Sequence, residues 1–159
     1  MEFLDPACEA CRAFAPVVKQ ILFLHPQEVR VVVRYAAFHQ GSDEAIRLLE
    51  AARRQGKFEQ MLAALFDGQD QWASHHSPNL QEAWKIAAAS GLDMARARKD
   101  AASKEAGELL RQENEDIVEL KVERTPTFFV NGKPLLQFGA EPLLKLVADE
   151  VAAAKKPAN

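Results

Sequence analysis

The chain has 159 residues, 48% of them hydrophobic and 27% charged, and a formal net charge of −3. This length suits one domain with a sizeable core, or a small domain that carries an insertion. So weak an acidic balance gives no electrostatic reason to expect nucleic acid as a partner, and no apolar stretch reaches the roughly 18 residues of a membrane span.

The amino terminus shows no recognisable secretion signal, because residues 1–3 lack both a basic region and a long apolar region. The first predicted strand starts almost at the first residue. We therefore expect that an N-terminal segment has been removed, and the terminus does not indicate the compartment.

The first forty or so residues predict a βαβ unit. Residues 2–4 have the character of a strand end, and residues 12–24 place apolar side chains on one helical face, with Pro16 bending the axis. Residues 29–38 are rich in β-branched side chains with little polar alternation, which is typical of a strand buried on both faces in a parallel sheet. The crossover is expected to be right-handed.

From residue 42 to residue 120 the pattern is helical and rich in Ala, Leu, Glu, Lys and Arg. Ser42 and Asn79 are expected N-caps, and Gly91 an expected C′ residue. We interpret the segment as a helical insertion rather than a second independent domain. Its predicted helices are residues 43–55, 57–66, 79–89, 93–99 and 102–120.

The strand pattern returns near the carboxyl end. Residues 127–130 precede Asn131-Gly132, a strong tight-turn signal, and residues 134–138 follow it, so the two segments should pair as an antiparallel hairpin. Residues 141–154 predict a last helix. The complete order is βαβ, helices, then ββα.

Cys8 and Cys11 are the only cysteines of the chain. They lie where the first strand gives way to the first helix, so the first sulfur is surrounded by unpaired backbone N–H groups. These groups and the helix dipole stabilise a thiolate. Because the thiolate is the species that attacks a disulfide, the pair is a candidate centre for thiol-disulfide exchange.

Three other interpretations of the cysteine pair stay open at this point. A structural disulfide closing so short a ring would constrain the unfolded chain little. A chance pair of buried cysteines is the second. The third is structural zinc, which normally needs four ligands and would have to draw two of them from His25, His39, His75 and His76, although adjacent histidine side chains diverge.

Four separated features resemble the DsbA-like family of thiol-disulfide oxidoreductases. They are the cysteine pair that begins the first helix, Glu2 six residues before Cys8, Pro16 five residues after Cys11, and Thr125-Pro126 before the hairpin. The resemblance spans nearly the whole chain and lacks only an upstream edge strand.

The resemblance implies an α/β architecture, a thioredoxin-like fold with a central mixed sheet and an inserted all-helical subdomain. Residues 1–41 and 121–159 would form the discontinuous thioredoxin-like domain, and residues 42–120 the inserted subdomain.

The resemblance also implies roles for individual residues. Cys8 is expected to attack, because at the helix start it is both exposed and stabilised as a thiolate, and Cys11 is the resolving thiol. Pro126 is expected to follow a cis peptide bond, which leaves the backbone of Thr125 free to pair with an extended substrate. Glu2 is expected beneath the thiols, where poor solvation raises its pKa and lets it relay the proton of Cys11.

Glu9 and Ala10 separate the cysteines, where the family's strongly oxidising members carry a histidine. Glu9 complements the helix dipole, which is worth about 0.3–1 kcal/mol, but it is a like charge beside the Cys8 thiolate. We expect this dipeptide to move the reduction potential towards the reducing side by some tens of millivolts.

Arg34, in the second strand, is a candidate neighbour of Glu2, with an ordinary charge at a strand edge as the equal alternative. The histidines, His39 among them, are expected to be structural or surface residues. No cofactor is expected other than the redox-active Cys8–Cys11 disulfide, and no metal.

The expected function is thiol-disulfide oxidoreductase, in the form of a protein disulfide oxidase. The alternatives are a reductase or isomerase of the same fold, a redox-inert peptide-binding module, and a glutathione-transferase-like enzyme, against which the second cysteine argues. Expected partners are substrate proteins with thiols or disulfides and a membrane or soluble redox partner, with no nucleic acid. By resemblance the protein is periplasmic or otherwise exported in a bacterium, with a cytoplasmic location as the alternative.

Overall fold

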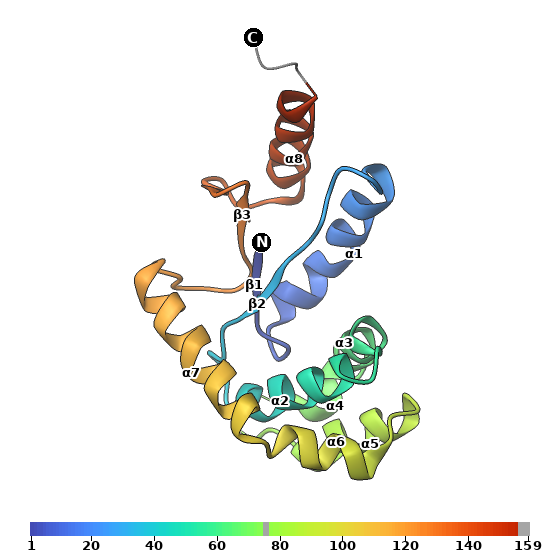
Figure 1. Cartoon of the computed structure of the whole chain (residues 1–159). Helices are drawn as coiled ribbons and strands as arrows, with labels where there is room; N and C mark the ends of the chain where they lie inside the picture. Colours follow the sequence, from blue (N-terminus) through green and yellow to red (C-terminus); the bar gives the residue numbers. More distant parts are fainter. Residues whose placement is uncertain (75–76, 156–159) are drawn as a thin grey trace.

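The computed structural model describes residues 1–74 and 77–155 (Figure 1). Within these ranges the order of strands and helices confirms the predicted βαβ, helices, ββα, and with it the α/β class. The elements in chain order are β1 (Glu2–Leu4), α1 (Glu9–Leu24), β2 (Val33–Tyr35), α2 (Ser42–Arg53), α3 (Phe58–Asp67), α4 (Gln69–Trp72), α5 (Leu80–Ala89), α6 (Met94–Ala101), α7 (Lys104–Glu119), β3 (Thr127–Val130), β4 (Lys133–Pro134) and α8 (Ala140–Ala154).

The strands form one mixed sheet in the order β2-β1-β3-β4. β1 runs parallel to β2, with Glu2 opposite Val33, and antiparallel to β3, with Glu2 opposite Phe128. β3 and β4 form the predicted antiparallel hairpin. Asn131 and Gly132 make its turn with positive φ angles of 49° and 81°, which is the conformation that this dipeptide favours.

β2 is shorter than predicted. It covers three residues instead of 29–38, because its partner β1 offers only three residues for pairing. The ladder ends with bonds from Glu2 N–H to the Val32 carbonyl and from Ala36 N–H to the Leu4 carbonyl, both 2.9 Å. Val32 is 41% exposed, so the expectation of a strand buried on both faces was wrong.

β4 is also shorter than the predicted residues 134–138. Pro134 has no N–H to give to a ladder, and Leu136 beyond it is 91% exposed. The bond from Leu135 N–H to the Phe128 carbonyl, 2.9 Å, is the last between the two segments among the described backbone contacts. The apolar character of this segment therefore does not reflect burial in the sheet.

The two faces of the sheet are covered by different helices, because successive side chains of a strand alternate. On one face Phe128 packs with Ile21 of α1 and Leu143 of α8. On the other face Phe3 packs with Ile117 of α7. Glu2, which lies opposite Phe128, therefore belongs to the face that α1 and α8 cover.

The helix boundaries agree with the predicted ones to within a few residues, and the caps explain the details. Asn79 is confirmed as an N-cap, since its side chain accepts a hydrogen bond from the N–H three residues on. Gly91, with φ 73°, follows the C-cap of α5 as predicted. Ser42 is not an N-cap: Gly41 takes that position with φ 82°, and the Ser42 hydroxyl donates to Asp5 instead.

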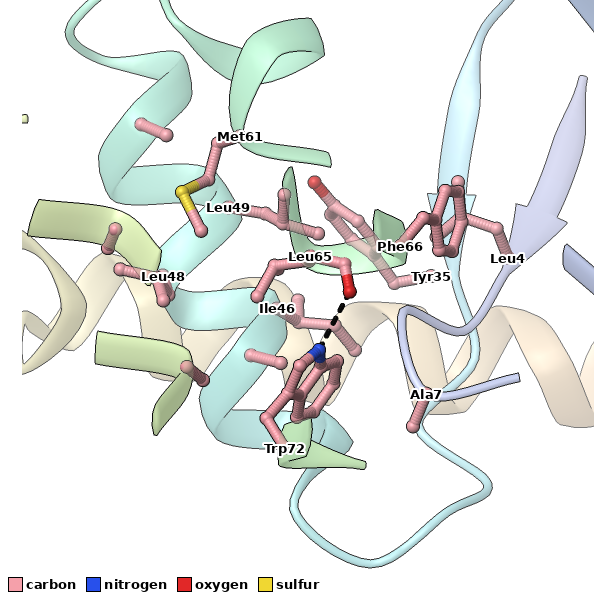
Figure 2. Close-up of a cluster of buried hydrophobic side chains, with 14 of the residues drawn as sticks. Leu4, Ala7, Tyr35, Ile46, Leu48, Leu49, Met61, Leu65, Phe66 and Trp72 are labelled. Carbon is pink, nitrogen blue, oxygen red and sulfur yellow. Dashed lines mark hydrogen bonds between the residues drawn. The ribbon is translucent and has the colours of Figure 1, made fainter. Parts of the chain in front are cut away.

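The principal buried cluster joins β1 and β2 to α2, α3 and α4 (Figure 2). Helix α4 was not predicted, because four residues are too few to show a helical period. It is held by Trp72, whose indole N–H donates to the Leu65 carbonyl at 2.8 Å inside this cluster. Cys8 and Cys11 belong to the same cluster, so the dithiol is built into the core.

Figure 1 shows α2 to α6 gathered towards one end of the molecule, with α8 towards the other and α7 running from the first group to the side of the sheet. The six helices α2 to α7 fall within the predicted insertion, residues 42–120, where the described residues form no strand. The division into a discontinuous thioredoxin-like domain and an insertion stays a prediction. Residues 156–159, the last four of the predicted thioredoxin-like domain, lie outside the described ranges. None of the helices described here is long and apolar enough to cross a membrane.

Candidate active site

The two cysteines lie at the amino end of α1. Cys8 is the N-cap residue, with extended backbone angles (φ −82°, ψ 122°), and Cys11 lies in the first turn. Both are free, so the structure describes the dithiol. The Cys8 sulfur lies 3.3 Å from the carbonyl oxygen of Thr125, just before β3.

The two thiols have opposite acidities. The Cys11 thiol, which donates a hydrogen bond to the Cys8 sulfur, lowers the pKa of Cys8 to about 5 against the effect of burial, and the Thr125 side chain and the N–H groups of Cys11 and Ala10 act with it. The same hydrogen bond, followed by burial, raises the pKa of Cys11 far above its ordinary value. The arrangement therefore favours ionisation of Cys8 and opposes ionisation of Cys11.

Cys8 is less accessible than expected. Only 6% of its surface is exposed, compared with 0% for Cys11. The reason is the contact with Thr125, which brings a loop from the far end of the chain onto the sulfur. The expectation of an exposed Cys8 was wrong for this state of the molecule, although Cys8 is the more accessible of the pair.

The Thr125–Pro126 peptide bond is cis, the isomer that the family resemblance implies. Pro126 is buried and Thr125 half-buried, and the loop they form leads directly into β3. The tertiary fold thus brings this loop against the thiols, as the sequence interpretation required.

Glu2 is buried, with 6% of its surface exposed, so the alternative of a solvated glutamate does not hold. Burial raises the pKa of Glu2 to about 7. The charge of Glu2 also contributes to raising the pKa of Cys11. Glu2 therefore lies close enough to the buried thiol to influence its ionisation.

Arg34 is not the partner of Glu2. In the β1–β2 register Arg34 lies opposite Phe3, and neighbouring side chains of a strand point to opposite faces, so Arg34 and Glu2 are separated by the sheet. The guanidinium lies over the Phe3 ring, 5.4 Å from its centroid. Its Nε donates to Glu113 at 3.0 Å, and it also pairs with Asp116, so it fastens α7 to the sheet.

Glu9 and Ala10 are the first residues of α1, which begins three residues before the predicted start at residue 12. Glu9 is exposed in the first turn of the helix, where its charge complements the helix dipole. Ala10 is half-buried, and its N–H is one of the groups that lower the pKa of Cys8. The dipeptide thus supplies an amide to the thiolate and an acidic side chain to its surroundings.

Asp5 is a residue of the site that sequence reasoning missed. It is fully buried, at 0% exposure. Its carboxylate accepts hydrogen bonds from Ala7 N–H (2.8 Å), Phe38 N–H (2.8 Å) and His39 N–H (3.0 Å), and from the Ser42 hydroxyl. The available signal was an acidic residue directly after an apolar strand and three positions before a C-x-x-C pair.

His39 has a more specific place than expected. Its Nδ1 lies 2.8 Å from Asp5 Oδ2, and its side chain is 28% exposed. Burial acts to lower the pKa of His39, but the hydrogen bond and charge of Asp5, with the charges of Cys8 and Glu9, raise it above its ordinary value. The ring therefore lies within the electrostatic reach of the thiolate.

Gln69 of α4 is a second missed residue. Its side chain is buried, and its Nε2 donates to the Pro6 carbonyl at 3.0 Å, two residues before Cys8. Asp5 and Gln69 hold the loop before Cys8 from two sides. Gln69 was overlooked because the helix that carries it shows no pattern in the sequence.

Residues 1–74 and 77–155 contain no group of three or more His, Cys, Asp or Glu side chains that could hold a metal ion. His75 and His76, considered from the sequence as zinc ligands, lie outside the described residues.

A thiolate and a buried thiol at the start of one helix, facing a loop before the next strand of the sheet, define the class of thiol-disulfide exchange proteins. The comparisons agree with this class. Residues 1–148 match the family model described as thioredoxin. None of the curated proteins compared with the chain is a significant match.

Solved structures with the same fold include a thioredoxin-like oxidoreductase from Silicibacter pomeroyi DSS-3, at 28% identity and a TM-score of 0.80, covering 98% of this chain and 86% of that one. DsbA from Xylella fastidiosa has 18% identity and a TM-score of 0.81, with 97% and 84% covered. A putative protein-disulfide isomerase from Pseudomonas syringae has 24% identity and a TM-score of 0.74, with 93% and 90% covered.

The chain belongs to the thioredoxin family, and its structural neighbours are DsbA-like thiol-disulfide oxidoreductases. This confirms the thioredoxin-like fold and the family resemblance that the sequence indicated. The protein is a thiol-disulfide oxidoreductase of the thioredoxin-like type.

Proposed function

We propose that the protein is a protein disulfide oxidase, which uses a Cys8–Cys11 disulfide to oxidise pairs of substrate thiols. The observation that carries the proposal is the opposite acidity of the two sulfurs, with the pKa of Cys8 lowered to about 5 and that of Cys11 raised. A stabilised Cys8 thiolate favours the reduced protein, and a couple whose reduced form is stabilised is a stronger oxidant.

The proposed reaction has two exchange steps. A substrate thiolate attacks Cys8, the Cys8–Cys11 bond breaks, and Cys11 leaves and takes up a proton. A second substrate thiolate then attacks the substrate sulfur of the mixed disulfide and releases Cys8 as a thiolate. Two electrons pass from the substrate to the cysteine pair, which a redox partner must oxidise again.

Glu2 is the proposed proton relay for Cys11. It is buried, its pKa is about 7, and its charge acts on Cys11. A carboxyl group with a pKa near the working pH both gives and takes a proton readily. It would supply the proton when Cys11 leaves and remove it when the disulfide forms again.

Thr125 and Pro126 are the proposed substrate-binding loop. The Thr125 backbone lies against the Cys8 sulfur, and Pro126, having no N–H, makes no competing donation. An extended substrate pairing with this backbone would present its own sulfur to Cys8. The redox-active group is then the cysteine pair alone, without a cofactor.

Substrate proteins with thiols or disulfides are the proposed partners, together with a membrane or soluble protein that oxidises the cysteine pair again. DsbA proteins are named among the structural neighbours, and the resemblance of the sequence to the DsbA-like family implies a periplasmic location. We propose the same location, or another form of export, for this protein. A reductase role is the second candidate, because Glu9 puts an acidic side chain where the strongly oxidising members carry a histidine.

Two assays run side by side test the proposal: oxidation of a reduced, unfolded protein by the disulfide form, and reduction of insulin by the dithiol form. An oxidase gives rapid oxidation and weak insulin reduction. The opposite ratio would establish the reductase. The Cys11→Ser variant should accumulate a mixed disulfide through Cys8, while Cys8→Ser should form none. Failure of Cys8 to react with iodoacetamide near neutral pH would support a redox-inert binding module.

A further inference from the structure

We propose that His39, held in place by Asp5, is a positioning residue whose positive charge stabilises the Cys8 thiolate and makes the cysteine couple more oxidising. It would supply, from the loop after β2, the cation that the Glu9-Ala10 dipeptide lacks. The inference rests on the proposed function, since it concerns the potential of the same pair.

The geometry links His39 to Cys8 through one buried carboxylate. Asp5 Oδ2 lies 2.8 Å from the ring Nδ1 of His39 and accepts a hydrogen bond from the backbone N–H of His39 at 3.0 Å. Asp5 Oδ1 accepts a hydrogen bond from the Ala7 N–H, and the Asp5 backbone carbonyl accepts one from the Cys8 N–H at 3.1 Å. The residue that orients the imidazole therefore also fixes the backbone of the nucleophile.

This anchor fixes the imidazole before any reaction takes place. Removing a donor from a fully buried carboxylate is costly, so Asp5 favours the ring position that it binds. A charge held in advance stabilises the thiolate without reorganisation. The exposed remainder of the ring leaves His39 able to exchange its proton with solvent.

The charges around His39 favour its cationic form. Within residues 1–74 and 77–155, the ionisable groups with the largest effects on it are Asp5, Cys8 and Glu9, all of which are negative when ionised, and the pKa of His39 is raised in spite of the opposing effect of burial. An attraction between two charged groups acts equally on both. The Cys8 thiolate that favours protonated His39 is therefore itself favoured by it.

The consequence is a balance between two residues of opposite sign. His39 stabilises the thiolate and raises the oxidising power of the disulfide, while Glu9 opposes it. Since the carboxylate of Asp5 offsets part of the imidazolium charge, the net effect on Cys8 is expected to be moderate, about threefold to tenfold in the ionisation equilibrium.

The first experiment compares His39→Gln with His39→Lys. Glutamine keeps a donor for Asp5 without the charge, and lysine restores the charge without the ring. The Cys8 pKa is read from the pH dependence of alkylation, and the potential from equilibrium with glutathione. His39→Gln should raise the Cys8 pKa and shift the glutathione equilibrium about threefold to tenfold towards the disulfide form of the protein. His39→Lys should bring the Cys8 pKa and the glutathione equilibrium most of the way back to the wild-type values.

His25→Gln is the matched control, because Cys8 and His25 lie at opposite ends of α1, a helix about 24 Å long. It should change neither quantity. Equal Cys8 pKa values and potentials in His39→Gln and the wild type would overturn the inference while leaving the proposed oxidase intact. A wild-type protein that neither oxidises thiols nor reduces disulfides would instead overturn the proposed function.

A second measurement uses only the wild-type protein, so it does not depend on the folding of a variant. The His39 ring is titrated by NMR in the dithiol and disulfide forms. Because oxidation removes the Cys8 thiolate, the His39 pKa should fall on forming the disulfide, by the same threefold to tenfold in its ionisation equilibrium. Identical His39 titration curves in the two forms would contradict the inference.

Discussion

Cys8 Sγ lies 3.3 Å from the carbonyl oxygen of Thr125, although 117 positions separate the two residues in the sequence. This contact joins the start of α1 to the loop before β3 and covers the more reactive of the two thiols. The site is thus closed by a segment that the chain reaches only after the six helices α2 to α7.

The side chain of Thr125 is one of the groups that lower the pKa of Cys8. Thr125→Val should therefore raise the Cys8 pKa and slow alkylation about threefold to tenfold in mildly acid solution, where less thiolate remains. Thr127→Val is the matched control, because its hydroxyl donates to the Arg124 carbonyl and not to the site. Equal alkylation profiles for the two variants would contradict the role of the Thr125 side chain.

The Glu9→His variant tests the expected effect of the dipeptide on the potential. Replacing the acid by a group that carries positive charge should move the potential towards the oxidising side by some tens of millivolts. Glu9→Gln, which removes the charge without reversing it, should fall between the wild type and Glu9→His. The measurement is the equilibrium with glutathione, and a potential that is the same in all three proteins would show that Glu9 does not tune the pair.

Glu2 should make the protein less stable as the pH rises. Burial raises its pKa from 4.5 to about 7, so the folded protein keeps a proton that the unfolded chain releases. The free energy of unfolding should therefore fall between about pH 4.5 and pH 7, by about 3 kcal/mol in total, and change no further through this group above that range.

Glu2→Gln should remove this dependence. Relative to the wild type, the variant should gain stability as the pH rises from about 4.5 to about 7, in urea unfolding of the disulfide form. Glu59→Gln, which removes an exposed carboxylate from α3, controls for the loss of a charge. If the difference in the free energy of unfolding between the wild type and Glu2→Gln did not change with pH, this would contradict the burial of an ionisable Glu2.

Arg34→Met should destabilise the protein by about 2 kcal/mol, because it leaves the buried Glu113 without its cation. Arg111→Met is the matched control: Arg111 also pairs with two acids of α7, Glu108 and Glu115, but all three side chains are exposed, so little stability should be lost. Equal unfolding midpoints for the two variants would show that Arg34 does not fasten α7 to the sheet.

Local sequence patterns were sufficient where a structure depends on neighbours along the chain. The hairpin at Asn131-Gly132 and the cap at Asn79 follow from short-range backbone preferences, and both were predicted correctly. The extent of β2 was not, because the length of a strand depends on the partner available to it. β1 offers three residues, and the apolar segment before Val33 stays outside the ladder.

The candidate site divides in the same way. Cys8, Cys11, Glu2 and Thr125-Pro126 could be assigned because their spacing from one another matches a family pattern. For Arg34 the sequence left two interpretations open, and the one that placed it beside Glu2 was wrong, since a one-residue difference in register decides which face of a sheet a side chain occupies. Gln69 could not be assigned at all from the sequence, because its four-residue helix shows no period.

The sequence by itself determined the order of elements and the thiol pair at a helix start, because these follow from periodicity and spacing, and its family resemblance indicated the acidic residue Glu2 beneath the pair. Only the tertiary structure decided what surrounds the pair. Burial of Cys8 under Thr125 and the anchoring of His39 by Asp5 depend on segments far apart in the chain. Burial and charge at the site are set by such contacts, and no local pattern encodes them.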